Sequence, residues 1–574
     1  MSGLPVPRPI RERPVPAALV ALTLLALAMR LVELGHRVFY YDEAWFGYWI
    51  LRFVDTGVWH YRPILHGPFY TRVNSAVFML VGANDFTARL VGAVVGGLLP
   101  LSAWLFRERL RDVEVVALGV ILTLNPLLLY YARFMRKDMP LAAFMLVTLG
   151  LLVRTLDTRR PRYLYAAAVT LGLAFTTKES VLLWVLTWLG AATLLLDRRL
   201  LRARDTGSGA RAALASLGRR GLAGLERWWR HLLGATALFF VVVVYFYAPR
   251  AHGVPGPGLW KALGGRFGML PAVVEDATVT ALSDAIDHWV KGGKQGHPYL
   301  PYFRDTLRTL AAGAGGVCLL AAVGFLADRY SGDAPRDLVA FNFYCGAAAV
   351  VGYPLANNFP VPWSTVHAVV PFAVPAAVGA GLVVRWARGE VGADLHPDWD
   401  VPWHVVRSGL AASVLTLLVV SAGVTAVQTS FVAPYESPKG PDGGHEIVYY
   451  AQAPGDLRQG VNAIADATAT GGDDVDVLYV GPRLTPPAHL SEETIGGSGT
   501  WHARMPIPWY TEALDADVAS TASPQNVTAA DAPPVVIAQP GVADAVANRL
   551  PTYDRRRQPL DDVADRTVVF FVKR

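Results

Sequence analysis

The chain has 574 residues, of which 53% are hydrophobic and only 17% are charged, and its mean hydropathy is positive. This composition excludes a purely soluble globular protein and indicates an integral membrane protein that carries a soluble part. The net charge of +6 conceals a split, because residues 436–574 hold 11 Lys and Arg against 19 Asp and Glu. The remainder is basic, but its basic residues lie in short loops between apolar runs. Nucleic acid is therefore not an expected partner.

Apolar runs along residues 1–428 predict about eleven transmembrane helices, the first of which is long enough to span and is not expected to be a cleaved signal. Basic loops alternate between these runs, so the positive-inside rule predicts a cytoplasmic N terminus and a cytoplasmic loop at 197–230. The tail, residues 429–574, is then predicted to be extracellular, in a multi-pass protein of the cell membrane. The runs lie at 16–35, 86–106, 113–131, 139–154, 163–178, 180–196, 232–249, 306–327, 338–355, 366–385 and 408–428.

Two adjacent carboxylates, Asp42 and Glu43, follow the first apolar run on the predicted outer side. Aromatic residues surround them, as is typical of the headgroup level of a bilayer. Carboxylates at this depth are expensive and mark functional sites, so one interpretation is a pair that meets a lipid headgroup. The other interpretation is a solvated helix start, with Asp42 as the N-cap and Glu43 in the first turn. Both stay open at this point.

A basic cluster, Arg133, Arg136 and Lys137, ends a later span on the same outer side. Cations on the outer side break the positive-inside trend, so a local partner is expected. A phosphate is the natural partner, because arginine offers forked donors and lysine a point charge. The alternative is a set of snorkelling anchors with an ion pair between Arg133 and Asp138.

Other ionisable residues lie in the remaining outer loops. Lys178 stands beside Glu179, where a phosphate contact and a structural ion pair are both open. His66 precedes a Gly-Pro dipeptide and either orients a substrate or caps a turn. The histidines lack metal-ligand spacing, so neither a cofactor nor a metal site is expected. A divalent cation held by the first-loop carboxylate pair and Asp138 is the alternative.

The tail has the pattern of a small α/β domain, because short buried strands alternate with helical segments. An aromatic-rich loop at 501–510 is expected either to dock on the membrane part or to bind glycan. Strands are predicted at 475–480, 535–538 and 567–572, and helices at 456–469 and 541–550.

The outer-loop motifs occur in a fixed order along the chain: Tyr41-Asp42-Glu43, His66-Gly67-Pro68, Arg133 to Asp138, Lys178-Glu179, and Pro362-Trp363 before His367. Over roughly the first 390 residues this order resembles the C-type glycosyltransferase superfamily. That superfamily includes the protein O-mannosyltransferases and the bacterial aminoarabinose transferases that modify lipid A. The last motif resembles more closely an archaeal and bacterial branch, labelled dolichyl-phosphate-mannose mannosyltransferase-like or flippase-activity-associated proteins of N-glycosylation.

The resemblance implies a polytopic α-helical fold of the C-type with a polyprenyl- or dolichyl-phosphate sugar as donor. It implies that Asp42 is the general base on the acceptor hydroxyl and that Glu43 orients acceptor or donor. The residues expected near the donor phosphate are Arg133, Arg136, Lys137 and Lys178. Those expected to contact substrate are Tyr41, His66, Asp138, Glu179, Trp363 and His367.

The predicted function is an inverting, hexosyl- or mannosyltransferase-like enzyme that transfers a sugar to a glycan, lipid or protein acceptor on the outer face. The alternative is a non-enzymatic flippase of lipid-linked sugars, or a flippase-associated component of a protein-glycosylation pathway. A translocase should carry charged residues along a path through the spans. Here they cluster at one face, which favours the enzyme.

Overall fold

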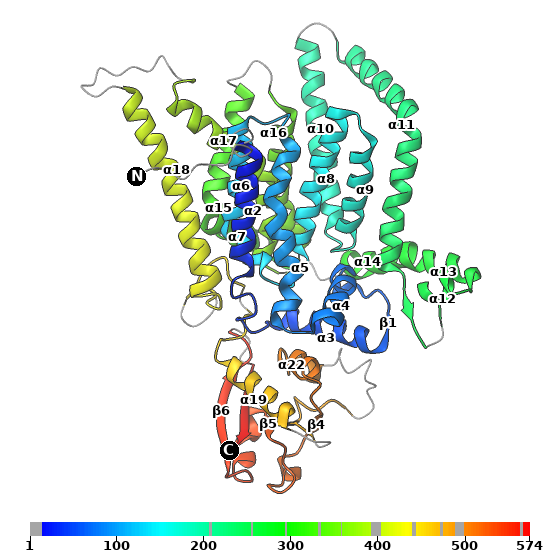
Figure 1. The fold of residues 1–574 in the computed structure, drawn as a ribbon, viewed down its shortest axis with the longest axis vertical. Helices are drawn as coiled ribbons and strands as arrows, with labels where there is room; N and C mark the ends of the chain where they lie inside the picture. The colour runs from blue at the N-terminus through cyan, green and yellow to red at the C-terminus, as the bar shows by residue number, and fades with distance from the viewer. Residues whose placement is uncertain are drawn as a thin grey trace. The chain divides into compact units, whose positions relative to one another are not determined.

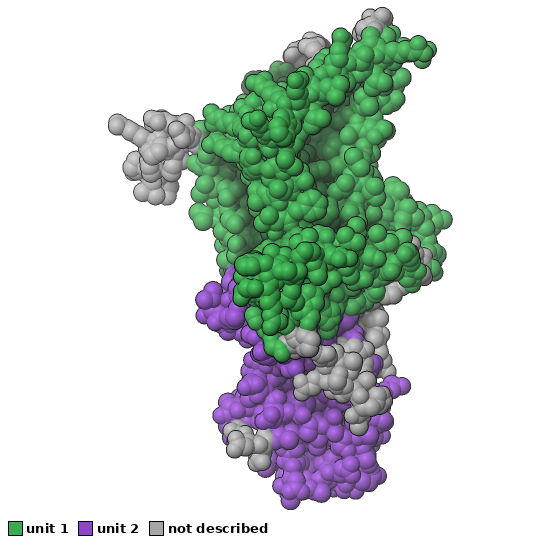
Figure 2. Space-filling model, turned by 90° about the vertical axis from the view of Figure 1, so that its right-hand side faces the viewer, with its two compact units in different colours: residues 1–32, 59–70, 92–432 green, residues 33–58, 71–91, 433–574 purple. Residues whose placement is uncertain are grey.

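The chain forms two compact units in this computed structural model (Figure 2). Unit 1 comprises Met1–Val32, Trp59–Tyr70 and Gly92–Val432, and unit 2 comprises Glu33–Val58, Thr71–Val91 and Ala433–Arg574. The structure describes residues 14–574 except 206–208, 254–255, 293–295, 331–334, 358, 392–402, 439–442, 450, 471–474, 488–498 and 563–565.

Nine helices of the described chain are long and apolar enough to cross a membrane, or ten if the bent pair α6 (Asp112–Leu124) and α7 (Pro126–Ala132) is one span. The remaining predicted run, 163–178, forms α9 (Pro161–Phe175), whose 15 residues fall short of the ~20 that a span needs. The predicted polytopic helical fold is confirmed. The nine are α2 (Pro14–Leu31), α5 with η2 (Asp85–Phe106), α8 (Asp138–Thr158), α10 (Val181–Asp205), α11 (Ala210–Tyr247), α15 (Tyr299–Tyr330), α16 (Asp337–Ala356), η6 with α17 (Pro362–Ala387) and α18 with η7 (Trp403–Val432) (Figure 1).

Helix α17 (Val366–Ala387) is the core of unit 1, because every residue from Val366 to Gly381 is buried. Its closest neighbour is α15, and small residues let the two backbones touch. A Cβ added to Gly379 would lie 2.2 Å from the carbonyl oxygen of Leu320. A Cβ added to Gly324 would lie 2.0 Å from the carbonyl oxygen of Pro375. Such small-residue contacts are typical of helices that pack inside membranes.

Two helix breaks face each other in unit 1. Helices α6 and α7 meet at an angle of 51° where Asn125 precedes Pro126, and α15 is kinked at Ala314. The Asn125 amide nitrogen donates to the carbonyl oxygen of Gly313 at 3.0 Å, and its side-chain oxygen accepts from the backbone N–H of Leu128. Backbone groups freed inside a membrane need such partners, because no water reaches them.

The tail in unit 2 folds around a five-stranded sheet of order β4-β3-β5-β7-β6. The three predicted strands form its centre, with β3 parallel to β4 and β5, and β7 antiparallel to β5 and β6. Both predicted helices are present, as α19 and α23, so the small α/β fold is confirmed. The unpredicted strands are the two edges; β6 carries three consecutive arginines, which suit an exposed edge. The elements are α19 (Leu457–Thr470), β3 (Val477–Val480), β4 (Val518–Thr521), β5 (Val535–Ala538), α23 (Ala543–Ala547), β6 (Tyr553–Pro559) and β7 (Thr567–Lys573).

Two segments of the predicted first outer loop and its flanks, Glu33–Val58 and Thr71–Val91, belong to the same compact unit as the tail. Helix α22 (Ile507–Ala513) packs on α3 (Tyr41–Thr56), where Trp509 is fully buried and stacks on Phe39 with ring centroids 4.8 Å apart. A Cβ added to Gly47 would lie 2.5 Å from the Trp509 ring, so the fit requires glycine. The aromatic-rich loop therefore docks, as the first of its two interpretations predicted.

Candidate functional site

Asp138 is the centre of a buried charge network in unit 1. It is the first residue of α8, where the helix dipole favours a carboxylate. Its Oδ1 accepts from Lys178 Nζ at 2.9 Å and lies 3.1 Å from His367 Nε2, and its Oδ2 lies 3.6 Å from Arg136 Nε. The side chain is 2% exposed. Three other predicted site residues thus meet around the carboxylate of Asp138.

The protonation of His367 follows from its two partners. The Trp184 indole N–H donates to His367 Nδ1 at 3.0 Å, so Nδ1 carries no proton. The ring proton is therefore on Nε2, which donates to Asp138. Tyr353 stacks on the imidazole with centroids 4.6 Å apart. His367 is a neutral residue that orients Asp138, and it adds no charge to the network.

Glu179 is the second carboxylate of this neighbourhood. It accepts from the Tyr61 hydroxyl at 2.6 Å and from His66 Nδ1 at 2.7 Å. Burial alone would raise the pKa of Glu179, but His66 and Tyr61 outweigh it and hold the pKa below its usual value. Burial lowers the pKa of His66, so the imidazole is neutral and donates through Nδ1. Trp289 stacks on His66 with centroids 4.9 Å apart.

The His66-Gly67-Pro68 turn has a structural reason for its glycine. A Cβ on Gly67 would lie 2.3 Å from the carbonyl oxygen of Thr176, and the backbone N–H of Phe69 donates to that same oxygen at 2.8 Å. The turn is thereby pinned to the segment that carries Lys178 and Glu179. His66 adopts φ 58°, an uncommon conformation for a residue with a side chain. Strain of this kind is found at functional sites.

Three cations lie in the neighbourhood of Asp138 and Glu179 in unit 1. They are Arg136, Lys137 and Lys178, since both histidines are neutral. Arg136 is 6% exposed and its guanidinium lies 3.3 Å from the centroid of the Trp363 ring; Lys137 is 5% exposed. The forked donors of arginine and the point charge of lysine are the groups that suit an anion such as a phosphate.

Arg133, the other predicted phosphate contact, caps a helix. Its guanidinium donates to the carbonyl oxygens of Met29, Arg30 and Val32, which end α2, at distances of 2.6 to 3.2 Å. It also lies 4.4 Å from the centroid of the Phe431 ring. These contacts favour the anchoring interpretation for this residue. The predicted ion pair of Arg133 with Asp138 is replaced by the contacts of Asp138 with Lys178 and His367.

Asp42, in unit 2, is the half-buried second residue of α3. The N-cap of this helix is Tyr40, so the interpretation of Asp42 as the cap is wrong. The Tyr40 hydroxyl donates to Asp42 Oδ2 at 3.4 Å. Tyr41 places its hydroxyl 2.7 Å from His502 Nδ1 of the tail, a contact between residues 461 positions apart. Sequence patterns carry no signal for His502.

Glu43 is bound in a buried ion pair within unit 2. Arg89 donates to Glu43 Oε1 from Nε at 2.8 Å and to Oε2 from a terminal nitrogen at 2.7 Å, and both side chains are fully buried. Arg89 also donates to the carbonyl oxygens of Leu34, Arg37 and Val38. This pairing assigns Glu43 a structural task, since it ties the start of α3 to the loop before it.

We expect Glu43→Gln to destabilise the protein strongly. The amide would leave Arg89 as an uncompensated buried charge, and breaking a buried pair costs about 3–5 kcal/mol. Thermal unfolding in detergent can be monitored with a thiol-reactive fluorophore or by size-exclusion chromatography. The midpoint of the variant should be clearly lower than that of the wild-type protein. A midpoint equal to that of the wild-type protein would contradict the structural role.

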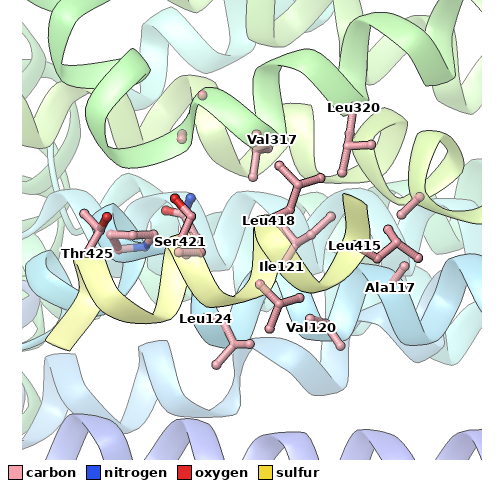
Figure 3. A pocket seen from close by; sticks show the side chains of 18 of the residues that line it. Ala117, Val120, Ile121, Leu124, Val317, Leu320, Leu415, Leu418, Ser421 and Thr425 are labelled. Carbon is pink, nitrogen blue, oxygen red and sulfur yellow. The ribbon is translucent and has the colours of Figure 1, made fainter. Parts of the chain in front are cut away.

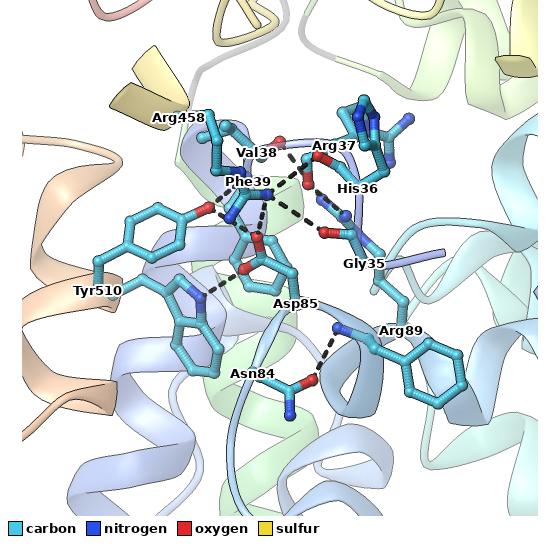
Figure 4. A network of polar contacts seen from close by, with 12 residues as sticks. Gly35, His36, Arg37, Val38, Phe39, Asn84, Asp85, Arg89, Arg458 and Tyr510 are labelled. Carbon is cyan, nitrogen blue, oxygen red and sulfur yellow. Dashed lines mark hydrogen bonds and ion pairs between the residues drawn. The ribbon is translucent and has the colours of Figure 1, made fainter. Parts of the chain in front are cut away.

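Asp85 fastens the tail to the first-loop segments and was not singled out by the sequence. Its Oδ1 accepts from Trp509 Nε1 at 3.0 Å, and its Oδ2 accepts from the Tyr510 hydroxyl at 3.0 Å and from Arg458 at 2.8 Å (Figure 4). The Tyr510 hydroxyl also accepts from the backbone N–H of Phe39. One buried carboxylate thus satisfies three donors from the tail.

An apolar pocket of about 330 Å³ lies between α6, α15, α17 and α18 in unit 1 (Figure 3). Its polar side chains are Asn125, Ser421 and Thr425, and none of its lining residues is charged. A phosphate would find no cation here, so this pocket is separate in chemistry from the Asp138 network. Among the described residues, no three His, Cys, Asp or Glu side chains are grouped as metal ligands.

Two family models match parts of the chain. Residues 65–217 match the model described as dolichyl-phosphate-mannose-protein mannosyltransferase. Residues 457–573 match the model of the Agl23 flippase-associated protein C-terminal domain. No curated protein matches the sequence. The first matched range contains most of the Asp138 network, and the first-loop carboxylates lie before it.

Solved structures resemble the chain over most of its length. ArnT from Cupriavidus metallidurans bound to undecaprenyl phosphate has a TM-score of 0.54 at 16% identity, with 96% of this chain and 97% of that chain covered. The fold is that of a C-type glycosyltransferase. The Archaeoglobus fulgidus oligosaccharyltransferase tethered with an acceptor peptide has a TM-score of 0.51 at 15% identity, over 89% of this chain and 64% of that one. The predicted resemblance to the C-type glycosyltransferases is confirmed.

Proposed function

We propose that this C-type glycosyltransferase is an inverting enzyme that moves a sugar from a polyprenyl- or dolichyl-phosphate to a glycan, lipid or protein acceptor on the outer face of the membrane. The observation that carries the proposal is the cluster of three cations in unit 1, the buried Arg136 and Lys137 and the half-buried Lys178, beside Asp138. A lipid phosphate suits this cluster, because arginine offers forked donors and lysine a point charge. The similar ArnT structure is bound to undecaprenyl phosphate, which supports this donor class.

The reaction needs a base and a stabilised leaving group. Sugar transfer passes through an oxocarbenium-like state, in which the acceptor oxygen bonds to the anomeric carbon while the bond to the phosphate oxygen breaks. The proposed base, Asp42, takes the proton of the acceptor hydroxyl. The electron pair leaves with the lipid phosphate, whose charge Arg136, Lys137 and Lys178 stabilise.

The remaining proposed roles follow from the contacts of each side chain. Asp138 and His367 hold the Lys178 ammonium in place, and Trp363 holds the plane of Arg136. Glu43 fixes the helix that carries Asp42 and is not itself the proposed base. Tyr41, His66 and Glu179 are the half-buried residues that remain as proposed substrate contacts.

The direct test is incubation of the purified protein with labelled polyprenyl-phosphate mannose and hexose donors. We expect label to leave the lipid in the presence of membrane-derived acceptors. A lipid that keeps its label with every sugar tested would overturn the proposal.

A second candidate rests on the match of residues 457–573 to a flippase-associated domain. A flippase-associated component of a glycosylation pathway would move or hand over a lipid-linked sugar without breaking it. In proteoliposomes, such a protein would make the labelled lipid accessible on the opposite leaflet while the label stays on the lipid. The same labelled lipid therefore distinguishes the two candidates, because the enzyme removes the label from the lipid and the flippase-associated component does not.

A further prediction concerns the side of the membrane on which each segment lies, because the proposal of a lipid donor rests on a site outside the cytoplasm. Gly218 and Gly541 are exposed and have open space for a side chain. Single cysteines there, in a background lacking Cys318 and Cys345, report through a membrane-impermeant thiol reagent in intact cells. The charge pattern predicts labelling at position 541 and none at 218. The opposite pattern would place the tail in the cytoplasm, where nucleotide sugars serve as donors.

A further inference from the structure

Asp42 lies between two residues whose side chains are bound by distant parts of unit 2. Glu43 is held by Arg89. On the other side, the Tyr41 hydroxyl and His502 Nδ1 are 2.7 Å apart, and the two rings stack at 5.8 Å with an interplanar angle of 19°. The first turn of α3 is therefore fixed on both sides of Asp42, once by the first-loop segments and once by the tail.

The Tyr41–His502 pair is itself held by its surroundings. Trp45, one helical turn after Tyr41, meets the imidazole edge-on with centroids 5.0 Å apart. The guanidinium of Arg566 lies 4.7 Å from the centroid of the Tyr41 ring, donates to the His502 carbonyl oxygen at 3.4 Å and pairs with Asp561. Two residues of the tail, His502 and Arg566, thus contact Tyr41, the residue before Asp42.

The direction of the hydrogen bond follows from the chemistry of the pair. Burial raises the pKa of Tyr41 to about 12, so the phenol keeps its proton. Burial and the charge of Arg566 lower the pKa of His502, so the imidazole is neutral at neutral pH. The phenol therefore donates and Nδ1 accepts. The pair is therefore neutral and adds no charge next to the Asp42 carboxylate.

We propose that His502 is a positioning residue of the enzyme: acting through Tyr41, it fixes the first turn of α3 and with it the carboxylate of Asp42. The tail would then contribute to the active site by holding the proposed base in position. This inference rests on the proposed function of Asp42 as the base. A base must lie within hydrogen-bond reach of its proton, and a misplacement of about 1 Å costs up to roughly a hundredfold in rate.

Docking of the tail does not depend on this pair alone. Asp85 binds three tail donors, Trp509 stacks on Phe39, and Arg52 pairs with Glu512 at 3.4 Å. A variant at His502 should therefore leave the tail docked. The Arg52–Glu512 pair also joins α3 to the tail, at a place away from Asp42, and Glu512→Gln is the matched control.

The test compares His502→Ala, His502→Asn, Tyr41→Phe and Glu512→Gln in the full-length protein. Two quantities are measured: kcat and KM for a labelled polyprenyl-phosphate sugar, and amide hydrogen exchange of residues 44–48. We expect His502→Ala and Tyr41→Phe to lower kcat roughly 10- to 100-fold with the donor KM unchanged. Exchange at 44–48 should rise in both. Their double variant should lose no more than either single one.

The asparagine variant supplies the positive control, because its side-chain oxygen can accept the Tyr41 proton where Nδ1 did. We expect His502→Asn to recover most of kcat and of the exchange protection, and Glu512→Gln to keep both. Wild-type kcat and unchanged exchange in His502→Ala would overturn the inference. So would an equal loss in Glu512→Gln, which would mean loss of docking. If the wild-type protein transfers no sugar, the proposed function fails, and unchanged exchange alone then decides against positioning.

Discussion

Asp42→Asn is expected to abolish sugar transfer while the protein stays folded and inserted. The amide keeps the shape of the carboxylate but cannot take the acceptor proton, and a positioned general base contributes about 10²–10⁴ in rate. Asp42 is half-buried and accepts from the Tyr40 hydroxyl at 3.4 Å, a hydrogen bond that the side-chain oxygen of asparagine can also accept. Loss of label from a polyprenyl-phosphate sugar measures the effect.

Glu43→Gln is the informative comparison for that variant, because the two carboxylates are neighbours with different tasks. The asparagine variant at position 42 should lose turnover and keep its thermal midpoint. The glutamine variant at position 43 should unfold at a clearly lower temperature than the wild-type protein, because the buried Arg89 loses its carboxylate partner. Near-normal turnover in Asp42→Asn would move the base elsewhere or end the proposal of an enzyme.

The spans and the central strands were predictable because their signals are local. An apolar run of sufficient length predicts a transmembrane helix, and short runs of β-branched residues predict buried strands. The cation cluster was predicted for a related reason, because the charges of the loops put Arg136 and Lys137 on the predicted outer side, where positive charge is not expected. The polar edge strand β6 carries no such local signal and was missed.

The partners of the site residues were not predictable, because they are distant in the sequence. Arg89 meets Glu43 across 46 positions, and Trp509 meets Asp85 across 424. The sequence shows the sign of a side chain's charge but not the residue with which it pairs. For this reason two interpretations stayed open for Arg133, until its contacts with the end of α2 favoured anchoring.

Contacts also explain why adjacent carboxylates are not equivalent. At the start of α3, successive side chains point about 100° apart around the helix axis. Glu43 points to the buried Arg89, whereas Asp42 remains partly exposed. Substrate can reach only the second kind of residue, so burial separates a structural acid from a candidate base where the sequence shows a single motif.

The second large effect is expected at Arg136. Arg136→Ala should lower kcat/KM for the lipid donor on the order of a hundredfold, because a group that stabilises developing charge is lost. The fold should survive, since Asp138 keeps Lys178 and His367 as partners. Arg136→Lys should also be impaired, because the stacking on Trp363 and the forked geometry both require a planar guanidinium.

The matched control for Arg136 is Arg133→Ala, three positions earlier. Its guanidinium caps α2, so its loss should lower the thermal midpoint and leave the donor KM of the remaining folded protein unchanged. Binding of unlabelled polyprenyl phosphate, measured by competition with the labelled donor, separates the two variants without relying on turnover. Equal donor dependence in Arg136→Ala, Lys137→Ala and the wild-type protein would return the whole cluster to membrane anchoring. A loss confined to Arg136 and Lys137 would instead locate the phosphate at the amino end of α8, where the helix dipole adds to the attraction of the two side chains.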